Sequence, residues 1–384
     1  MCCMANLLDY LKWRGDLSLQ ACPFGEIDNL ILSQMSNLLW EKILSAGEAK
    51  TIAELMLLIK DQSIAQGITA ADDEKLFPLV AASQRFGDVI ACEYVHEQDE
   101  ISEKQFAAIT FLLPDDTVFV SYRGTDSTLL GWKEDFNLAF TSPIPSQLHA
   151  QQYLQEIANH YGGLLRVGGH SKGGNLAMYA ASTVDEGIQS TILDVFNNDG
   201  PGLSGAVANS EGYERIKPRL SSFVPQSSVV GMLLIHPDIY TVVNSNSVSV
   251  FQHNPYSWQV EGPGFIREKE LRKGSVYLEK VLKRWLAEID EQQRKCFIDT
   301  LFRVLNSTDA KSFGKDLLYQ TFRNPGAMLG AVQDIDRETL GSLYASLTAL
   351  VTAALDAEST KTNDASTPLL LESQPAESIR KLEE

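Results

Sequence analysis

The sequence lacks the features that mark several large classes of protein. It has no continuous run of 18 or more apolar residues, so we expect no membrane-spanning helix. Basic residues are in the minority, with 32 Lys and Arg against 50 Asp and Glu. The resulting net charge of −18 disfavours nucleic-acid binding and a polybasic membrane anchor, since both need clustered positive charge. We therefore expect no nucleic-acid partner, no stable membrane span and at most transient contact with a lipid surface.

Cysteine is scarce and has no metal-binding spacing. The five cysteines are Cys2, Cys3, Cys22, Cys92 and Cys296. Their odd number and irregular spacing match no zinc or redox motif and predict reduced thiols in the cytoplasm. No basic or strongly apolar segment surrounds the first pair, so we expect no secretory signal peptide. The Asp-x-Asp pair at Asp334 and Asp336 lacks the rest of a calcium loop, and no glycine-rich nucleotide loop follows a first strand. We therefore predict neither a metal nor another cofactor.

The pattern of apolar residues divides the chain into segments. The 384 residues, 44% of them hydrophobic, suffice for a full core. Helical spacing predicts a helical N-terminal segment over 1–95, with helix also over residues 69–96, whereas the segment 96–266 alternates strands and helices. The predicted strands are 106–113, 117–122, 164–167, 192–197, 221–224, 240–243 and 248–251. Strands that alternate with helices predict a mostly parallel sheet covered on both faces, and hence an α/β fold.

Two further segments follow the predicted sheet. Residues 267–357 carry apolar stripes at helical spacing and predict a helical C-terminal appendage that packs on the core or offers a surface to a partner. Residues 358–384 are polar, rich in Ser and Thr, and carry charges of both signs. We expect this last segment to form a disordered tail.

The pentapeptide at residues 169–173, Gly-His-Ser-Lys-Gly, is the most informative motif. It has the form Gly-x-Ser-x-Gly, follows a predicted strand and precedes a predicted helix. This context is typical of the nucleophile elbow of α/β-hydrolases, where a serine lies on a strained turn that only small neighbours allow. We therefore predict that Ser171 is a nucleophile. The alternative is a glycine turn that only packs a helix on a sheet.

A serine nucleophile needs a base, and in this fold the base follows the serine along the chain. Only His236 and His253 lie after the elbow, because the other histidines precede the serine. We favour His253, which follows the last predicted strand in a loop of turn formers and aromatic residues. His170 belongs to the elbow itself, and we expect its side chain to face away from the nucleophile.

An acid must orient the base, and the sequence offers three candidates. Asp199 ends the strand after the elbow, where neighbouring glycines permit close approach, and we favour it. Asp238 lies beyond the expected loop, and Asp194 lies within the strand. A turn aspartate that only caps backbone N–H groups is the alternative for Asp199.

Two backbone N–H groups would complete an oxyanion hole. The first is expected from Lys172, the residue after the nucleophile. The second is expected from Thr125, in the loop after an early strand. Trp132 and Asp135 follow and are expected to cover or buttress this loop. The long segment 127–148, which contains two prolines, is a candidate lid.

Several motifs occur in register between residues 90 and 260. They are Tyr122-Arg-Gly-Thr-Asp126, Trp132 with Asp135, His149-Ala150, Gly169-His-Ser-Lys-Gly-Gly174, and His253 followed by Trp258. In order and spacing they resemble the class 3 lipases, which have an Arg-Gly-Thr oxyanion loop, a Gly-His-Ser-x-Gly-Gly elbow and a final histidine often followed by Trp. The resemblance implies an α/β-hydrolase fold. The apolar pattern adds a helical N-terminal extension and a helical C-terminal appendage to it.

The N-terminal segment carries motifs of its own, at residues 9–16 and 28–33. They resemble an uncharacterised bacterial family of lipase-like proteins of unknown function, over most of the chain. One departure from the class 3 lipases concerns the acid, which in that family follows a later strand. Ser227 or Ser228 stands there in this sequence. Either Asp199 takes over the orienting role, or the site is a dyad, or activity is lost.

We expect a cytoplasmic serine hydrolase that cleaves a carboxylic ester of a lipid or another small acyl substrate through an acyl-enzyme intermediate. Ser171 would attack the carbonyl, His253 would take its proton and Asp199 would orient the histidine, while Lys172 and Thr125 hold the oxyanion. A thioesterase or peptidase with the same site stays open, as does a non-catalytic hydrolase-fold protein that binds a lipid or protein partner. The oligomeric state is left open.

Overall fold

The computed structural model describes residues 5–59, 63–67, 69–126, 128–138, 141–235 and 240–288, together with residues 293, 298–300, 302 and 341. Within these residues the main sheet has nine strands in the order β1-β2-β3-β4-β5-β6-β7-β8-β11. Their bounds are β1 Lys50–Thr51, β2 Ile90–Asp99, β3 Lys104–Leu112, β4 Thr117–Tyr122, β5 Leu164–His170, β6 Ile192–Asn198, β7 Leu220–Pro225, β8 Thr241–Val243 and β11 Arg267–Glu268. A separate pair is formed by β9 Val260–Glu261 and β10 Gly264–Phe265.

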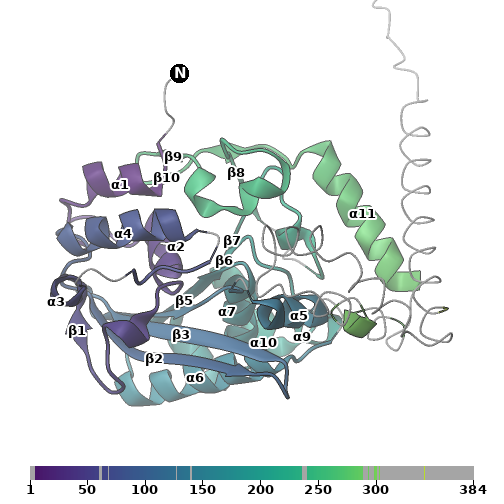
Figure 1. Ribbon diagram of the computed structural model, residues 1–384, viewed down its shortest axis with the longest axis horizontal. Coiled ribbons are helices and arrows are strands. Elements are labelled where there is room, and N and C mark those ends of the chain that lie inside the picture. The colour runs from purple at the N-terminus through teal and green to yellow at the C-terminus, as the bar shows by residue number, and fades with distance from the viewer. Residues whose placement is uncertain are drawn as a thin grey trace, which may run out of the picture.

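Helices cover both faces of this sheet (Figure 1). Their bounds are α1 Leu7–Arg14, α2 Glu26–Met35, α3 Ile52–Leu58, α4 Ala70–Ala82, α5 Leu129–Leu138, α6 Pro145–Tyr161, α7 Lys172–Thr183, α8 Glu186–Thr191, α9 Gly205–Ala208, α10 Glu211–Ile216 and α11 Lys273–Glu288. Short 3-10 helices are η1 Trp40–Lys42, η2 Lys217–Arg219, η3 Val230–Met232, η4 Ser249–His253 and η5 Pro255–Ser257. No helix in the described part of the chain is both long and apolar enough to cross a membrane.

The strands from β4 to β8 run parallel to one another, and antiparallel strands flank them at both edges. Parallel strands need crossover connections, and here α6 and α7 supply two of them. The carboxyl ends of parallel strands meet at one edge of the sheet, where ligand sites of α/β proteins form. The predicted α/β-hydrolase fold with a mostly parallel sheet is confirmed.

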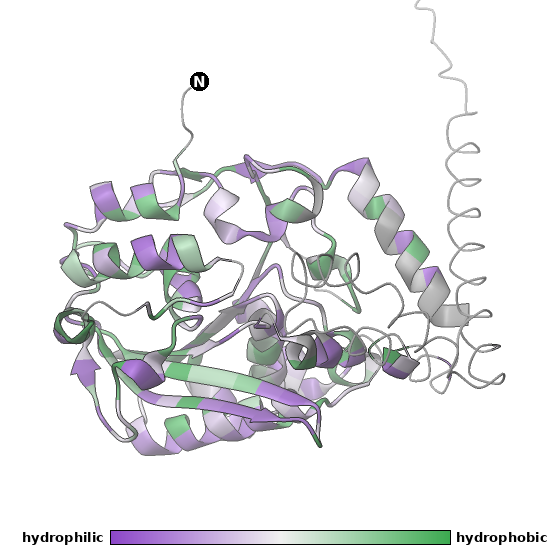
Figure 2. Ribbon diagram, viewed as in Figure 1, coloured by the Kyte–Doolittle hydropathy of each residue, from purple (hydrophilic) through white to green (hydrophobic). Residues whose placement is uncertain are grey.

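Two hydrophobic cores lie on opposite faces of the sheet. One joins the N-terminal helices α1, α2 and α4 to the sheet, and it includes Leu30, Trp40 and Phe119. The other joins α6 and α7 to the opposite face, and it includes Leu154 and Leu176. Figure 2 shows β3 as a largely hydrophobic strand beside the more hydrophilic β2, as expected when β3 is buried almost throughout and the end of β2 is exposed. The N-terminal segment thus forms one layer of the fold together with residues 256–265.

Two secondary-structure predictions differ from the structure. Helix was predicted over 69–96, yet only α4 is helical there, and residues from Ile90 onward form β2. The pairing of β2 with β3 shifts register between Cys92 and Val95, and this irregularity breaks the alternation that would mark a strand. A strand was predicted over 248–251, where the chain forms η4 instead. Its apolar residues Val248 and Phe251 are exposed, so hydrophobicity there does not report a buried strand.

Part of the predicted C-terminal organisation lies outside the described residues. Of the predicted appendage 267–357, the structure describes β11, α11 and a few later positions. The predicted tail, residues 358–384, lies entirely outside the described residues. The boundary predicted at residues 95 and 96 falls within β2, which is one continuous strand.

Candidate active site

The strand β5 and the helix α7 are joined by the sharp turn predicted from the pentapeptide. Ser171 lies at this turn with φ of 57° and ψ of −131°, a strained conformation for a residue with a side chain. A Cβ atom on Gly169 would lie 2.3 Å from the carbonyl carbon of Gly173, and one on Gly173 would lie 2.1 Å from the oxygen of Tyr122. Only glycine fits at these two positions, so the local sequence accounts for the turn.

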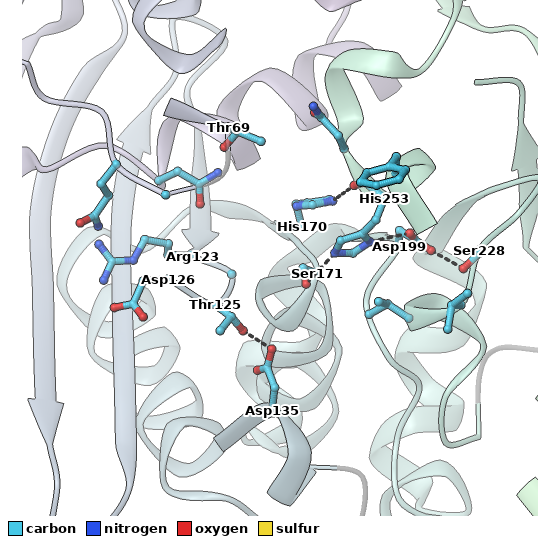
Figure 3. A pocket seen from close by; sticks show the side chains of 18 of the residues that line it. Thr69, Arg123, Thr125, Asp126, Asp135, His170, Ser171, Asp199, Ser228 and His253 are labelled. Carbon is cyan, nitrogen blue, oxygen red and sulfur yellow. Dashed lines mark hydrogen bonds and ion pairs between the residues drawn. The ribbon is translucent and has the colours of Figure 1, made fainter. Parts of the chain in front are cut away.

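Three predicted side chains meet in one chain of hydrogen bonds (Figure 3). The distance from Ser171 Oγ to His253 Nε2 is 3.0 Å, and that from His253 Nδ1 to Asp199 Oδ2 is 2.7 Å. With Nδ1–H donated to the carboxylate, Nε2 is left to accept the serine proton. The three residues come from the end of β5, the end of η4 and the end of β6. This arrangement can activate a hydroxyl as a nucleophile.

The carboxylate of Asp199 is held by the following loop. Its other oxygen, Oδ1, accepts a hydrogen bond of 2.5 Å from the hydroxyl of Ser228. Asp199 is fully buried, and its backbone N–H donates to Phe223 O across 2.8 Å. A Cβ atom on Gly231 would lie 2.5 Å from Asp199 Oδ1, so this loop reaches the carboxylate only because glycine stands there. The serine at the position expected for an acid therefore contacts Asp199 directly.

The sequence also offered His236 as the base and Asp238 or Asp194 as the acid, and the structure describes only Asp194. His236 and Asp238 lie outside the described residues. Asp194 lies on β6 and forms an ion pair with Arg166, with Nε and Oδ2 3.0 Å apart. Asp194 therefore has a partner other than His253.

The side chain of His170 takes a position that the sequence did not predict. It was expected to face away from the nucleophile, yet it lines the same cavity as Ser171. Its Nε2 is 2.9 Å from the backbone oxygen of His253, and the two imidazole rings are 4.6 Å apart. Burial, reinforced by the nearby His253, lowers the pKa of His170 well below its ordinary value. The neutral ring therefore donates Nε2–H to the loop that carries His253.

The two residues predicted to hold an oxyanion flank Ser171. Thr125 lines the cavity, and its hydroxyl donates to Asp135, which buttresses the loop as predicted. Burial raises the pKa of Asp135 to about 6, against the opposing effect of the Lys172 charge. The Lys172 ammonium is buried and contacts Glu134 and Gln105, with Nζ 2.9 Å from Glu134 Oε2. Because its side chain is engaged elsewhere, Lys172 can contribute only its backbone N–H at the turn. The Ser171 side chain makes no capping hydrogen bond to the helix.

The segment predicted as a lid contains the helix α5. Glu134 on this helix pairs with Lys172 and also accepts hydrogen bonds from Gln105 N and Ser146 Oγ. This buried ion pair ties α5 to the elbow helix. Parts of this segment lie outside the described residues, namely Ser127, residues 139–140 and the side chain of Trp132.

Asn198 precedes Asp199 directly and contributes to the site through its side chain, a role that the sequence alone does not predict. Its amide nitrogen donates to Gly169 O across 3.0 Å and to Asn29 Oδ1 across 3.2 Å. Asn29 Nδ2 donates back to Asn198 Oδ1 across 2.9 Å. Helix α2 is thereby linked to the strand ends that carry Ser171 and Asp199. No signal within one sequence pairs residues so far apart.

A cavity of about 520 Å³ opens over Ser171. Its lining residues are Asn37, Gln66, Gly67, Thr69, Arg123, Gly124, Thr125, Asp126, Asp135, His170, Ser171, Asp199, Ser227, Ser228, Val229, Val230, Phe251, His253 and Asn254. Among the described residues, no three His, Cys, Asp or Glu side chains are grouped so that they could hold a metal ion.

The parallel sheet, the strand–Ser171–helix turn and the covering helices define a lipase-like α/β-hydrolase fold. Residues 80–303 match the family described as Mbeg1-like. The match spans more than half of the chain, which therefore belongs to the Mbeg1-like family. The predicted lipase-like α/β-hydrolase is thereby confirmed.

Three solved structures show a remote likeness to this chain. A mutant form of MDLA from Penicillium cyclopium is 11% identical, with 64% of this chain and 86% of that chain covered and a TM-score of 0.35. A lipase from Rhizopus microsporus var. chinensis is 16% identical, with 61% and 87% covered and a TM-score of 0.32. The Rhizomucor miehei lipase propeptide complex is 15% identical, with 66% and 76% covered and a TM-score of 0.35. No curated protein matches the sequence significantly.

Proposed function

We propose that this protein is a serine hydrolase that cleaves a carboxylic ester of a lipid or another small acyl substrate. Ser171 is the nucleophile, His253 is the general base and Asp199 is the acid that orients the base. The observation that carries this proposal is the continuous chain from Ser171 Oγ through His253 to Asp199, with distances of 3.0 and 2.7 Å, beside a cavity. Distances of this size suit proton transfer between a nucleophile and its base.

The reaction follows from the roles of these three groups. His253 Nε2 takes the proton as Ser171 Oγ attacks the ester carbonyl, and the imidazolium is stabilised by the Asp199 carboxylate. The same proton passes to the leaving alkoxide as the acyl–oxygen bond breaks, which leaves an acyl-enzyme. His253 then removes a proton from water, and the resulting hydroxide attacks the acyl carbon. As the bond between that carbon and Ser171 Oγ breaks, His253 returns the proton to Ser171 Oγ, and the carboxylic acid is released.

The oxyanion that forms during each attack needs hydrogen-bond donors already in place. We assign this role to the backbone N–H groups of Lys172 and Thr125. Lys172 is the first residue of α7, where unpaired N–H groups and the helix dipole favour negative charge. The Thr125 side chain is fixed by Asp135, which keeps its loop in position.

The cavity supports the proposed substrate class. Val229, Val230 and Phe251 give it an apolar part beside the proposed catalytic residues, which suits an acyl chain. The free thiols of Cys22 and Cys92 support the expectation of a reducing, cytoplasmic compartment. A thioester or an amide would use the same groups, so the leaving group is decided by experiment.

Hydrolysis measured on matched substrates tests the proposal. An ester, a thioester and an amide of one short acyl group should be offered to the wild-type protein and to Ser171→Ala. We expect the ester to be cleaved, and kcat to fall by a factor on the order of 10⁶ in Ser171→Ala. Ser182→Ala is the matched control, since Ser182 lies on the same helix with its hydroxyl bonded to Met178 O. If no acyl substrate is turned over, the non-catalytic binding protein is the better account.

A further inference from the structure

A buried arginine, Arg123, lines the cavity over Ser171 without a hydrogen-bond partner for its guanidinium. Arg123 is only 2% exposed, and none of its three side-chain nitrogens has an acidic partner or a close hydrogen bond among the described residues. The neutral Tyr94 hydroxyl lies near enough that Arg123 opposes the rise of the Tyr94 pKa that burial causes. Its backbone is fixed, because its N–H donates to Ala107 O across 3.0 Å. A guanidinium does not lose its proton in a protein, so a buried positive charge lies in the wall of this cavity.

Two other buried cations show how this fold normally treats such a charge. Arg85 Nη2 lies 2.5 Å from Asp28 Oδ2, and Lys172 Nζ lies 2.9 Å from Glu134 Oε2. Arg123 has no such ion pair within the described part of the chain. A buried charge without a counterion costs several kcal/mol, so the exception calls for a ligand that supplies the missing anion.

The nearest acidic side chain along the chain does not supply that anion. Asp126 also lines the cavity, but it accepts a hydrogen bond of 2.7 Å from Gln98 Nε2 and another of 2.9 Å from Thr128 N. It forms no ion pair with Arg123. The charge of Arg123 is felt nearby, since after burial it is the main cause that lowers the pKa of His96. The guanidinium is thus charged, and no acidic side chain of the described residues pairs with it.

The position of Arg123 separates two parts of the cavity. Figure 3 shows Arg123 and Asp126 on one side of Ser171, with His253, Asp199 and Ser228 on the other. Val229 and Val230 follow Ser228 directly and, with Phe251, give the lining its apolar side chains. A substrate with its ester carbonyl at Ser171 would therefore extend in two directions, toward an apolar wall and toward a cation.

We propose that Arg123 binds an anionic group, a phosphate or a carboxylate, in the alcohol portion of the ester that Ser171 cleaves. The inference rests on the proposed hydrolase function and narrows its substrate class. The planar guanidinium can donate two parallel hydrogen bonds to either anion. The acyl chain lies against Val229 and Val230, and the neutral polar groups of Asn37, Gln66 and Thr69 in the same cavity suit the rest of a polar head group. The protein as a whole has a net charge of −18 and repels anions, whereas this buried cation attracts an anion locally.

The test compares three esters with the same short acyl chain. They are a 1-acylglycerol, a 1-acylglycerol 3-phosphate and the corresponding acyl ester of glyceric acid, so that the head group is neutral, a phosphate or a carboxylate. We expect the wild-type kcat/KM to favour one of the anionic esters over the neutral one, and the favoured ester identifies the anion. In Arg123→Gln that preference should fall by about 10- to 100-fold, as for the loss of hydrogen bonds to a charged group. Arg123→Lys should keep part of it, because the charge stays while the paired donors are lost.

A matched control and a binding measurement separate the possible failures. Lys75→Gln removes an exposed positive charge outside the cavity lining and should leave the preference for the anionic ester as in the wild type. A wild type without such a preference, or an Arg123→Gln variant that loses neutral and anionic esters equally, overturns the inference. The wild-type comparison decides the matter even if Arg123→Gln does not fold.

Calorimetric binding of the 1-acylglycerol 3-phosphate and the glyceric acid ester to Ser171→Ala addresses the case in which no ester is cleaved. Binding of either anionic ester that disappears when Arg123→Gln is added supports the anion site and leaves only the hydrolase proposal refuted. Hydrolysis without any preference refutes the anion site and leaves the hydrolase proposal intact. Absence of both binding and hydrolysis refutes both.

Discussion

At the scale of single residues, the proposed catalytic acid depends on a neighbour from another strand. Asp199 follows β6, and Ser228 follows β7 and donates a hydrogen bond of 2.5 Å to the carboxylate oxygen that His253 leaves free. In the class 3 lipases that the sequence resembles, the acid itself stands at the later position. Asp199 and Ser228 follow adjacent parallel strands and contact each other. An acid at either position could therefore reach His253 with little change in geometry.

Substitution of the acid distinguishes a triad from a dyad. Asp199→Asn should lower kcat by about 10⁴-fold, because an amide favours the wrong imidazole tautomer and does not stabilise the imidazolium. Ser228→Ala removes only one supporting hydrogen bond and should lower kcat/KM by a smaller factor, about 10-fold. Steady-state kinetics on the preferred ester measure both effects.

The double variant Asp199→Ser with Ser228→Asp serves as the control for these two substitutions. It restores the class 3 lipase arrangement and should recover part of the activity that Asp199→Asn loses. Near-wild-type turnover by Asp199→Asn would instead mean that Ser171 and His253 act as a dyad.

Individual residues of the site were predictable to different degrees. The position of Ser171 was predictable, because its two neighbouring glycines and its place between strand and helix are local properties of the sequence. His253 and Asp199 followed from chain order and from the ends of predicted strands. The contact of His170 with the His253 backbone and the unpaired guanidinium of Arg123 were not predictable, because each depends on a loop or strand distant in sequence.

At the scale of elements, α4 supports the loop that carries the proposed base. Tyr256, three residues after His253, donates its hydroxyl to Asp73 Oδ1 across 2.5 Å. Thr69 Oγ1 donates to the other oxygen of Asp73 across 2.7 Å. Burial raises the pKa of Asp73 from 3.8 to about 6 despite these hydrogen bonds. The contact between α4 and this loop therefore includes the Asp73 carboxyl group, which is harder to ionise in the folded protein.

This contact predicts a particular dependence of stability on pH. The unfolded chain releases the Asp73 proton near pH 4 and the folded protein near pH 6, so the folded state binds more protons between these values. The free energy of unfolding should therefore fall as pH rises from 4 to 6, by on the order of 3 kcal/mol for this group. Asp73→Asn removes the charge, keeps one acceptor oxygen for the Tyr256 hydroxyl and places an NH2 group where the Thr69 hydroxyl can accept, so it should lose less stability over that range. Urea denaturation at several pH values measures the slope.

Tyr256→Phe provides the comparison for that measurement. It removes a hydrogen bond that favours the ionised carboxylate, so the decline in stability should persist and extend to higher pH. Equal slopes in the wild type and in Asp73→Asn would contradict the assignment of the effect to Asp73.

Elements were predictable where hydrophobicity and periodicity agreed. The strands β3, β4, β5, β6 and β7 and the helix α7 lie where the sequence predicted them. At β2 the sequence predicts helix, because the irregular pairing with β3 disrupts the alternation of buried residues. At η4 it predicts a strand, because exposed apolar side chains look the same in a sequence as buried ones.

At the scale of the whole molecule, the N-terminal segment packs on the sheet and also contributes residues to the site. It covers one face of the sheet, and Asn29 on α2 ties it to Asn198 beneath the elbow. Asn6 Nδ2 donates to Tyr256 O across 2.9 Å, and Ala5 O accepts from Val260 N across 2.9 Å. Asn37, Gln66 and Thr69 bring the same segment to the cavity wall. The substrate would therefore meet this segment as well as the sheet.

The central claim is that Ser171, with His253 and Asp199, is a reactive nucleophile. The most direct measurement is to treat the wild-type protein with a fluorophosphonate probe and to map the modified residue by peptide mass spectrometry. The account predicts one modified site, Ser171, with labelling greatly slowed in His253→Ala and absent in Ser171→Ala. A probe attached to another residue, or labelling of Ser171 that proceeds equally fast without His253, would contradict it.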